Sequence, residues 1–180
     1  MAERYGLILG RSFYERPTVE VARDLLGKVL VHEKAAGRIV EVEAYLGLED
    51  RAAHASRGLT QRTRVLFGPP GHAYVYLIYG MYECLNLVAE PEGLPGCVLV
   101  RAIEPLAGIE GPASGPGKLT RAMGITRRHN GADVTRGALT VRRLPSEPAF
   151  EVSVTPRIGI RQEMDRPLRF LVAGSRFVSR

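Results

Sequence analysis

The chain has 180 residues, a length that fits one domain with a substantial core. Its 25 basic residues against 19 acidic ones give a formal net charge of +6, which favours polyanionic partners, nucleic acid first. Two cysteines imply no disulfide framework, and no stretch reaches the apolar length of a membrane span, so a disulfide-stapled or membrane-spanning protein is excluded.

Only three of the basic residues are lysines, which leaves 22 arginines. Arginine suits bidentate contacts with phosphate, but a GC-rich genome would produce the same bias, and both explanations stay open. No signal peptide begins the chain, so we expect a cytoplasmic protein. No metal is expected, because the four histidines lack the spacing of metal ligands: His32, His54, His72 and His129.

The first regular pattern follows Pro17 and Thr18. It predicts a short amphipathic helix that ends at Gly27, with one apolar face made of Val19, Ala22, Leu25 and Leu26. A strand is predicted over Gly27 to His32, and a turn over Ala35 to Gly37.

The next stretch, Arg38 to Leu46, reads as a strand with alternating sides. Alternation places Glu41, Glu43 and Tyr45 together on the face opposite Val40 and Val42. Two carboxylates beside an aromatic side chain are typical of a solvated sheet surface, and they would also suit the wall of a functional site. The pattern alone leaves both interpretations open.

Residues 49–71 show no sustained periodicity and predict a long loop, a feature that is usually functional or mobile. His54 lies in this loop, where a lone histidine is most often solvated. Four arginines accompany it: Arg51, Arg57, Arg62 and Arg64.

Residues 72–89 predict a β-hairpin around which the chain is organised. Two runs rich in aromatic and β-branched residues, His72 to Ile78 and Cys84 to Ala89, flank a link that contains Gly80. Large side chains, Tyr79 and Met81 among them, therefore lie at the turn, where small polar residues are usual. An apolar tip on a basic protein suits a wedge between base pairs, whereas aromatics inside the strands, such as Tyr74, are ordinarily core.

Residues 96–105 predict a buried strand that contains Arg101, which needs a carboxylate or a bound anion nearby. Asn86, inside the second hairpin run, likewise needs a partner for its amide. Residues 114–125 predict a helix whose start could hold a phosphate or could simply be capped. Three further strands are expected, over residues 138–144, 152–160 and 168–173.

These elements predict one mixed α/β (α+β) domain over residues 1–180, built around a mostly antiparallel sheet with a protruding hairpin. Nearly the whole chain resembles the alkyladenine (3-methyladenine) DNA glycosylases of the mammalian alkylpurine type. Three motifs in the family's order carry the resemblance: RIVEVEAYLGLEDRAAHASRG, HAYVYLIYGMYECLN and CVLVRAIEPL. The long N-terminal extension of the mammalian members is missing, and residues 57–71 match only loosely.

The resemblance implies an enzyme that flips a damaged purine out of duplex DNA and hydrolyses its N-glycosidic bond. We expect it to be monofunctional, because none of the three lysines lies in the matched pocket motifs, and to need no metal or organic cofactor. Glu43 matches the catalytic carboxylate, and Arg101 matches the arginine that helps hold the attacking water. Tyr79 matches the residue that intercalates into DNA, and Met81 a second tip residue that packs against DNA. The implied base pocket consists of Tyr45, His54, Tyr76 and Asn86.

The expected partner is double-stranded DNA that contains damaged purines, bound by a monomeric, nucleoid-associated protein. Two rival functions remain open. A non-catalytic nucleic-acid-binding module would use the same basic surface and aromatic tip without needing Glu43. A carbohydrate glycosidase would use Glu41 and Glu43 as a carboxylate pair, although neighbours on one strand do not by themselves flank a scissile bond.

Overall fold

The computed structural model describes residues 2–179 and contains one sheet in which all the strand pairings are antiparallel. The predicted α+β class and mostly antiparallel sheet are confirmed. The described strands are β1 (Leu7–Ile8), β2 (Val29–His32), β3 (Ala35–Tyr45), β4 (Ala73–Ile78), β5 (Tyr82–Ala89), β6 (Gly96–Ala107), β7 (Leu139–Arg143), β8 (Val152–Thr155) and β9 (Arg169–Val172).

Strand β3 is the branch point of the sheet, whose main order is β1-β7-β2-β3-β6-β5-β4. Its first part pairs with β2, residues 41–43 pair with β9, and β6 runs along its other edge. The register of β3 against β6 shifts around Glu41, as at a β-bulge. The middle of β3 is therefore enclosed by neighbouring strands, and both of its carboxylates are buried there.

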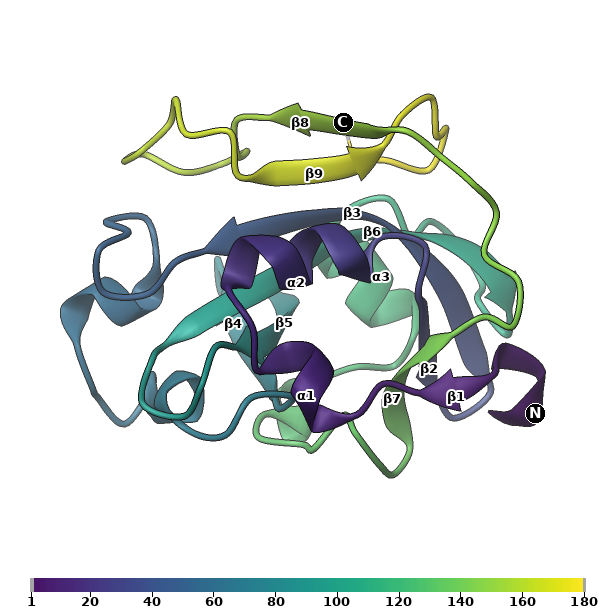
Figure 1. Cartoon of the computed structure of the whole chain (residues 1–180), viewed down its shortest axis with the longest axis horizontal. Helices are drawn as coiled ribbons and strands as arrows, with labels where there is room; N and C mark the ends of the chain where they lie inside the picture. The colour runs from purple at the N-terminus through teal and green to yellow at the C-terminus, as the bar shows by residue number, and fades with distance from the viewer. Residues whose placement is uncertain (1, 180) are drawn as a thin grey trace.

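Three short α-helices pack on the sheet, and α2 lies in front of β3 and β6 (Figure 1). The predicted helix and its end at Gly27, which has φ +81°, are confirmed, although Val21 is a fully buried member of the face that the pattern missed. The helices are α1 (Arg11–Tyr14), α2 (Thr18–Leu25) and α3 (Pro116–Ala122), with 3₁₀ turns η1 (Ala2–Tyr5), η2 (His54–Arg57), η3 (Arg64–Phe67) and η4 (Arg127–His129).

Two local predictions are wrong. Residues 35–37 belong to β3, and the chain turns before them, where Glu33 has φ +53°. Gly37 allows close packing of β3 against Ile103, because a Cβ at this position would lie 2.6 Å from Cδ1 of Ile103. The strand expected over residues 152–160 ends at Thr155, since Pro156 cannot donate to a ladder, and the chain beyond it runs to the middle of β3.

The predicted hairpin is confirmed as β4 and β5, which pair from Ala73 with Leu87 to Ile78 with Tyr82. Tyr79 and Gly80 both have positive φ, +53° and +69°, as a tight hairpin turn requires. The side chains of Tyr79 and Met81 are 79% and 64% exposed, so the large apolar residues at the tip face solvent.

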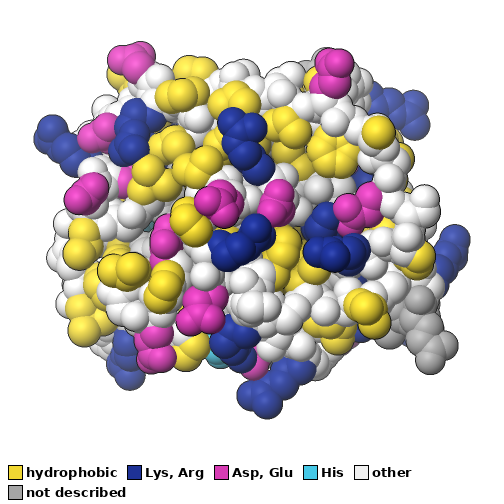
Figure 2. All heavy atoms as spheres, in the orientation of Figure 1, with side chains coloured by type: hydrophobic (Ala, Val, Ile, Leu, Met, Phe, Trp, Pro, Cys, Tyr) yellow, Lys and Arg dark blue, Asp and Glu magenta, His cyan; other side chains and the backbone are white. Residues whose placement is uncertain are grey.

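The face that carries α1 and α2 shows acidic and basic side chains interspersed with apolar ones (Figure 2). The net positive charge is therefore not concentrated on this face. Within residues 2–179, none of the helices has the length and apolar character needed to cross a membrane.

Candidate active site

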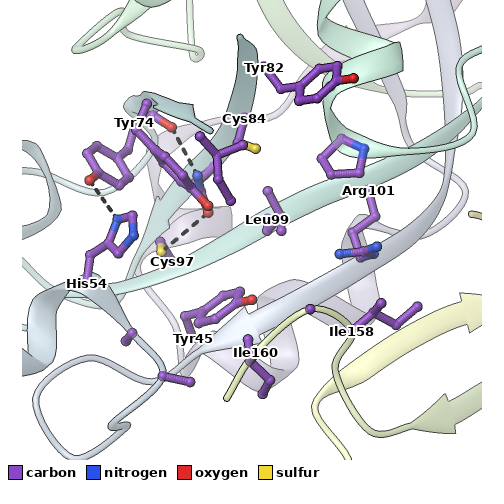
Figure 3. A pocket seen from close by; sticks show the side chains of 18 of the residues that line it. Tyr45, His54, Tyr74, Tyr82, Cys84, Cys97, Leu99, Arg101, Ile158 and Ile160 are labelled. Atoms are coloured by element: carbon purple, nitrogen blue, oxygen red, sulfur yellow. Dashed lines mark hydrogen bonds between the residues drawn. The ribbon is translucent and has the colours of Figure 1, made fainter. Parts of the chain in front are cut away.

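A cavity of about 570 Å³ lies beside the hairpin. Its walls come from the end of β3, the loop at residues 51–55, strands β4 to β6, the start of α3 and residues 158–162 (Figure 3). All four residues of the predicted base pocket line this cavity: Tyr45, His54, Tyr76 and Asn86. Arg101 and Tyr79 line it too, whereas Met81 does not.

The aromatic wall is held together by contacts among three rings. Nδ1 of His54 lies 2.9 Å from the hydroxyl of Tyr74, and the rings of His54 and Tyr76 meet edge to face with centroids 4.5 Å apart. Tyr74 is buried, as the core interpretation expected, yet it also lines the cavity. His54 is thus part of a packed wall and not a solvated loop residue.

Burial, together with the positive charges of Arg62 and Arg57, lowers the pKa of His54 to about 4. The imidazole is therefore uncharged at neutral pH. Burial also raises the pKa of both pocket tyrosines, Tyr45 and Tyr76, so their hydroxyls stay protonated. The rings of the pocket are neutral aromatic surfaces under physiological conditions.

Asn86 is buried and its amide is satisfied, as the sequence required. Its Nδ2 donates to the backbone oxygen of Tyr74 across 3.2 Å, and the Cys97 thiol lies 3.8 Å from its Oδ1. Both bonds hold the amide in one orientation. The cysteines, Cys84 and Cys97, are free and buried, and burial raises their pKa values to about 11 and about 12.

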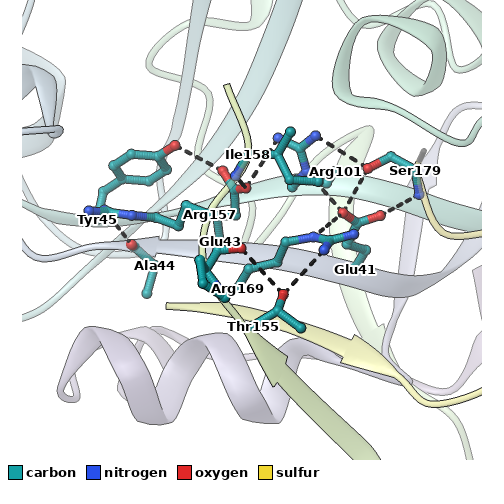
Figure 4. Close-up of polar contacts among 11 residues, drawn as sticks. Glu41, Glu43, Ala44, Tyr45, Arg101, Thr155, Arg157, Ile158, Arg169 and Ser179 are labelled. Carbon is teal, nitrogen blue, oxygen red and sulfur yellow. Dashed lines mark hydrogen bonds and ion pairs between the residues drawn. The ribbon is translucent and has the colours of Figure 1, made fainter. Parts of the chain in front are cut away.

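Glu43 lies directly behind the cavity wall with no exposed surface, so the interpretation of a solvated sheet face is wrong. Three lining residues hold its carboxylate (Figure 4). Oε2 accepts a hydrogen bond of 2.9 Å from the Tyr45 hydroxyl. Oε1 accepts one of 2.7 Å from the backbone N–H of Ile158 and lies 3.3 Å from Nη1 of Arg101.

Arg101 has two buried carboxylates as partners, which meets the need inferred from the sequence. Its Nε donates to Oε1 of Glu41 across 3.0 Å, while Nη1 faces Glu43. Glu41 also accepts hydrogen bonds from Arg169 and from the backbone and hydroxyl of Ser179, at 2.7, 2.5 and 2.7 Å. Although burial would raise the pKa of Glu41, these donors lower it below its ordinary value, so Glu41 is an ionised anchor at neutral pH.

A family model described as methylpurine-DNA glycosylase matches residues 12–176. This chain belongs to the methylpurine-DNA glycosylase family. It is 52% identical to a protein of Methanocella arvoryzae, with 96% of each chain covered, and 50% identical to one of Methanoculleus marisnigri, with 97% of this chain and 100% of the relative covered. A Legionella pneumophila protein is 47% identical over 96% of this chain and 98% of its own. Each carries the provisional name 3-methyladenine DNA glycosylase.

The glycosylase also contains a buried ion pair that sequence reasoning missed. The guanidinium of Arg157 donates to both oxygens of Asp50, at 2.5 and 2.9 Å, and both side chains are fully buried. The same guanidinium lies 4.6 Å from the centroid of the Tyr45 ring. Arg157 therefore fixes Tyr45 from behind and brings Ile158 to Glu43. No local signal marked Asp50, because it lies in a loop without periodicity.

The glycosylase places one lysine at the cavity, although none of the three lysines lies in the matched motifs that carry the pocket residues. Lys118 at the start of α3 lines the cavity, and the backbone at Gly117 packs against the Tyr82 ring near the hairpin tip. Lys118 is therefore a rim residue. Across residues 2–179, no group of three or more His, Cys, Asp or Glu side chains is arranged to hold a metal ion.

Proposed function

We propose that this glycosylase flips alkylated or deaminated purines out of duplex DNA and hydrolyses their N-glycosidic bonds with a water activated by Glu43, leaving an abasic site. The substrates are of the 3-methyladenine, hypoxanthine and ethenoadenine class. The observation that carries the proposal is that Tyr45, Arg101 and Ile158 hold a buried carboxylate at the wall of a ring-lined cavity.

In this proposal, the aromatic wall binds the flipped base. Tyr45 and Tyr76 offer neutral ring faces, which attract the positive charge of a base such as 3-methyladenine by about 0.5 to 2 kcal/mol. Hypoxanthine is uncharged, so its recognition depends on hydrogen bonds and on the weaker pairing that makes flipping easier. The fixed amide of Asn86 disfavours the exocyclic amino group of guanine, and neutral His54 contributes a polar edge.

Glu43 would act from behind the wall. A carboxylate has about four acceptor positions, and Tyr45, Ile158 and Arg101 occupy three of them, which leaves capacity for one water. As the bond breaks, the sugar gains oxocarbenium character, which an ionised Glu43 stabilises while it accepts the proton of the water. Arg101, whose Nη1 lies 3.3 Å from Oε1 of Glu43, orients the water. Ile158 is 40% exposed, so a small movement of its segment would open a path for water from the cavity to Glu43.

Tyr79 would fill the gap that the flipped nucleotide leaves, with Met81 packing against the neighbouring bases. Their exposure at the hairpin tip, next to the cavity, supports these roles. We further propose that the enzyme is a monomeric, monofunctional glycosylase that needs no metal or organic cofactor, forms one glycosylase domain over residues 1–180 and works in the cytoplasm at the nucleoid.

The rival functions are less well supported. Glu41 is surrounded by Arg101, Arg169 and Ser179 and does not line the cavity, so it is unsuited to serve as the second carboxylate of a carbohydrate glycosidase. A binding module without catalysis would have no use for the carboxylate held by three cavity residues.

The test uses the protein in excess, without metal, on duplex oligonucleotides that carry one hypoxanthine or one ethenoadenine. Alkali then reveals abasic sites. We expect cleavage at the lesion by the wild type and not by Glu43→Gln. If neither lesion is cleaved, methylated duplex DNA is the next substrate, and failure there as well would favour the binding module.

A further inference from the structure

Arg62 is an exposed loop residue placed against the back of the base pocket. Its guanidinium carbon lies 5.5 Å from the centroid of the Tyr76 ring, over the ring face. Tyr76 lines the cavity and Arg62 does not, so the arginine lies behind the ring. A hydrogen bond from Arg62 and its positive charge also act on the Tyr74 hydroxyl, opposing the rise in pKa that burial causes there.

Arginines therefore stand behind both tyrosines of the pocket, but their charges are balanced differently. Arg157, behind Tyr45, is neutralised by its two bonds to Asp50. Arg62 has no ion pair with any carboxylate in residues 2–179. Its positive charge is therefore not balanced by a carboxylate.

No acidic side chain among the described residues lines the cavity, and the carboxylate behind its wall, Glu43, has no exposed surface and is already paired with Arg101. The charged lining residues are all basic: Arg51, Arg101, Lys118 and Arg161. A cationic base that enters must rely on the ring faces for favourable electrostatic contact.

We propose that Arg62 is a specificity-determining residue that biases this pocket toward uncharged purine lesions and against cationic ones. An aromatic ring attracts a cation through the negative potential of its face. A guanidinium on the far face of Tyr76 draws on the same potential and repels a second cation on the near face. A neutral base, such as hypoxanthine, stacks on the same ring without that repulsion.

This inference rests on the proposed function, and its test compares two substrates of one enzyme. Hypoxanthine in an oligonucleotide is the neutral lesion, and 3-methyladenine in methylated duplex DNA, measured by its release, is the cationic one. Single-turnover rates over a range of enzyme concentrations give a specificity constant for each substrate. Their ratio cancels any loss of general DNA affinity that removal of a loop arginine causes.

Three variants separate charge from structure. We expect Arg62→Gln to raise the 3-methyladenine to hypoxanthine ratio about twofold to fivefold, the scale of one exposed cation–π contact. Arg62→Lys, which keeps the charge, should remain near the wild-type ratio. Arg64→Gln removes an exposed arginine two positions along, which stacks on no aromatic ring within residues 2–179, and should leave the ratio unchanged.

The outcomes are distinguishable. If the wild type excises both bases and Arg62→Gln leaves the ratio unchanged or lowers it, the inference about Arg62 is wrong while the proposed function stands. An equal rise in Arg62→Lys and Arg62→Gln would show that charge is not the cause, and would overturn it too. If the wild type excises neither base, the proposed function fails and this inference fails with it.

Discussion

The backbone N–H of Ile158 donates a hydrogen bond of 2.7 Å to the carboxylate of Glu43, although 115 positions separate the two residues in the chain. The segment after β8 thus closes over the middle of β3, where the sheet branches (Figure 4). Glu41, two positions before Glu43, is tied in the same way to Ser179 near the end of the chain. The last part of the chain encloses both buried carboxylates.

Glu43→Gln should abolish excision while leaving DNA binding in place. The amide keeps the size of the side chain but can neither carry the negative charge nor accept a proton from water, and general-base help is worth about 10² to 10⁴ in rate. Single-turnover excision of hypoxanthine measures the loss, and equilibrium binding to the same duplex measures retained affinity.

Glu20→Gln is the matched control for this change, because Glu20 is an exposed glutamate on α2, away from the cavity. It should excise at the wild-type rate. A Glu43→Gln protein that keeps most of its single-turnover rate would remove Glu43 from the catalytic role.

Asp50→Asn should destabilise the protein by about 3 to 5 kcal/mol, the cost of leaving a buried arginine without its carboxylate. Despite burial, hydrogen bonds from Arg157 and backbone donors lower the pKa of Asp50 below its ordinary value. Because the folded-state pKa is depressed, this stabilisation is present above about pH 4 and is lost as pH falls through the folded value. Urea unfolding of the wild type and of Asp50→Asn measures the difference in their free energies of unfolding, which should be smaller at pH 3 than at pH 7.

The exposed ion pair between Arg16 and Asp24, at 2.8 Å, supplies the comparison. Asp24→Asn should cost less than about 1 kcal/mol, since exposed ion pairs contribute little. Equal losses of stability in the two variants would mean that the Asp50–Arg157 pair adds nothing beyond a surface contact.

The sequence predicts the elements of this fold well wherever local patterning decides them. The hairpin follows from its aromatic runs and Gly80, and α2 follows from its apolar face and Gly27. The prediction fails at Gly37, which has a typical turn composition around it but serves close packing against Ile103. Such a contact depends on a strand far along the chain, so local propensity cannot reveal it.

The sequence predicts which residues form the candidate site, but not which segments of the chain bury them. Alternation along β3 places Glu43 beside Tyr45, and the cost of burying Arg101 indicates a carboxylate partner. The burial of Glu43 depends on Ile158, and that of Asp50 on Arg157, from a segment more than a hundred positions away. Period-two patterning says which side a residue faces, but not what covers that side.

Lys118 allows a direct test of whether the enzyme is monofunctional. A lyase forms a Schiff base between an amine and the sugar, which borohydride reduces to a stable covalent adduct. Because Lys118 is an exposed residue at the start of α3 and the bond is proposed to break beside the buried Glu43, we expect no adduct with hypoxanthine duplex and no strand cleavage before alkali. An adduct that forms with the wild type and disappears in Lys118→Gln would identify a lyase instead.

Tyr79→Ser should lose activity on duplex DNA because fewer damaged nucleotides are flipped, not because the chemistry is slower. Without the ring, the gap in the stack stays unfilled, and the unstacking cost of a few kcal/mol is no longer offset. The side chain is 79% exposed, so its removal should leave folding intact. A fluorescent base beside the lesion reports the flipped population, and Leu7→Ser, an 82% exposed apolar residue outside the hairpin, is the control. Normal flipping by Tyr79→Ser together with slow excision would show that Tyr79 acts in the chemical step and not as a wedge. Weak flipping that improves when the lesion lies opposite a mismatched base would support the wedge role, because a mismatch lowers the unstacking cost that the ring must offset.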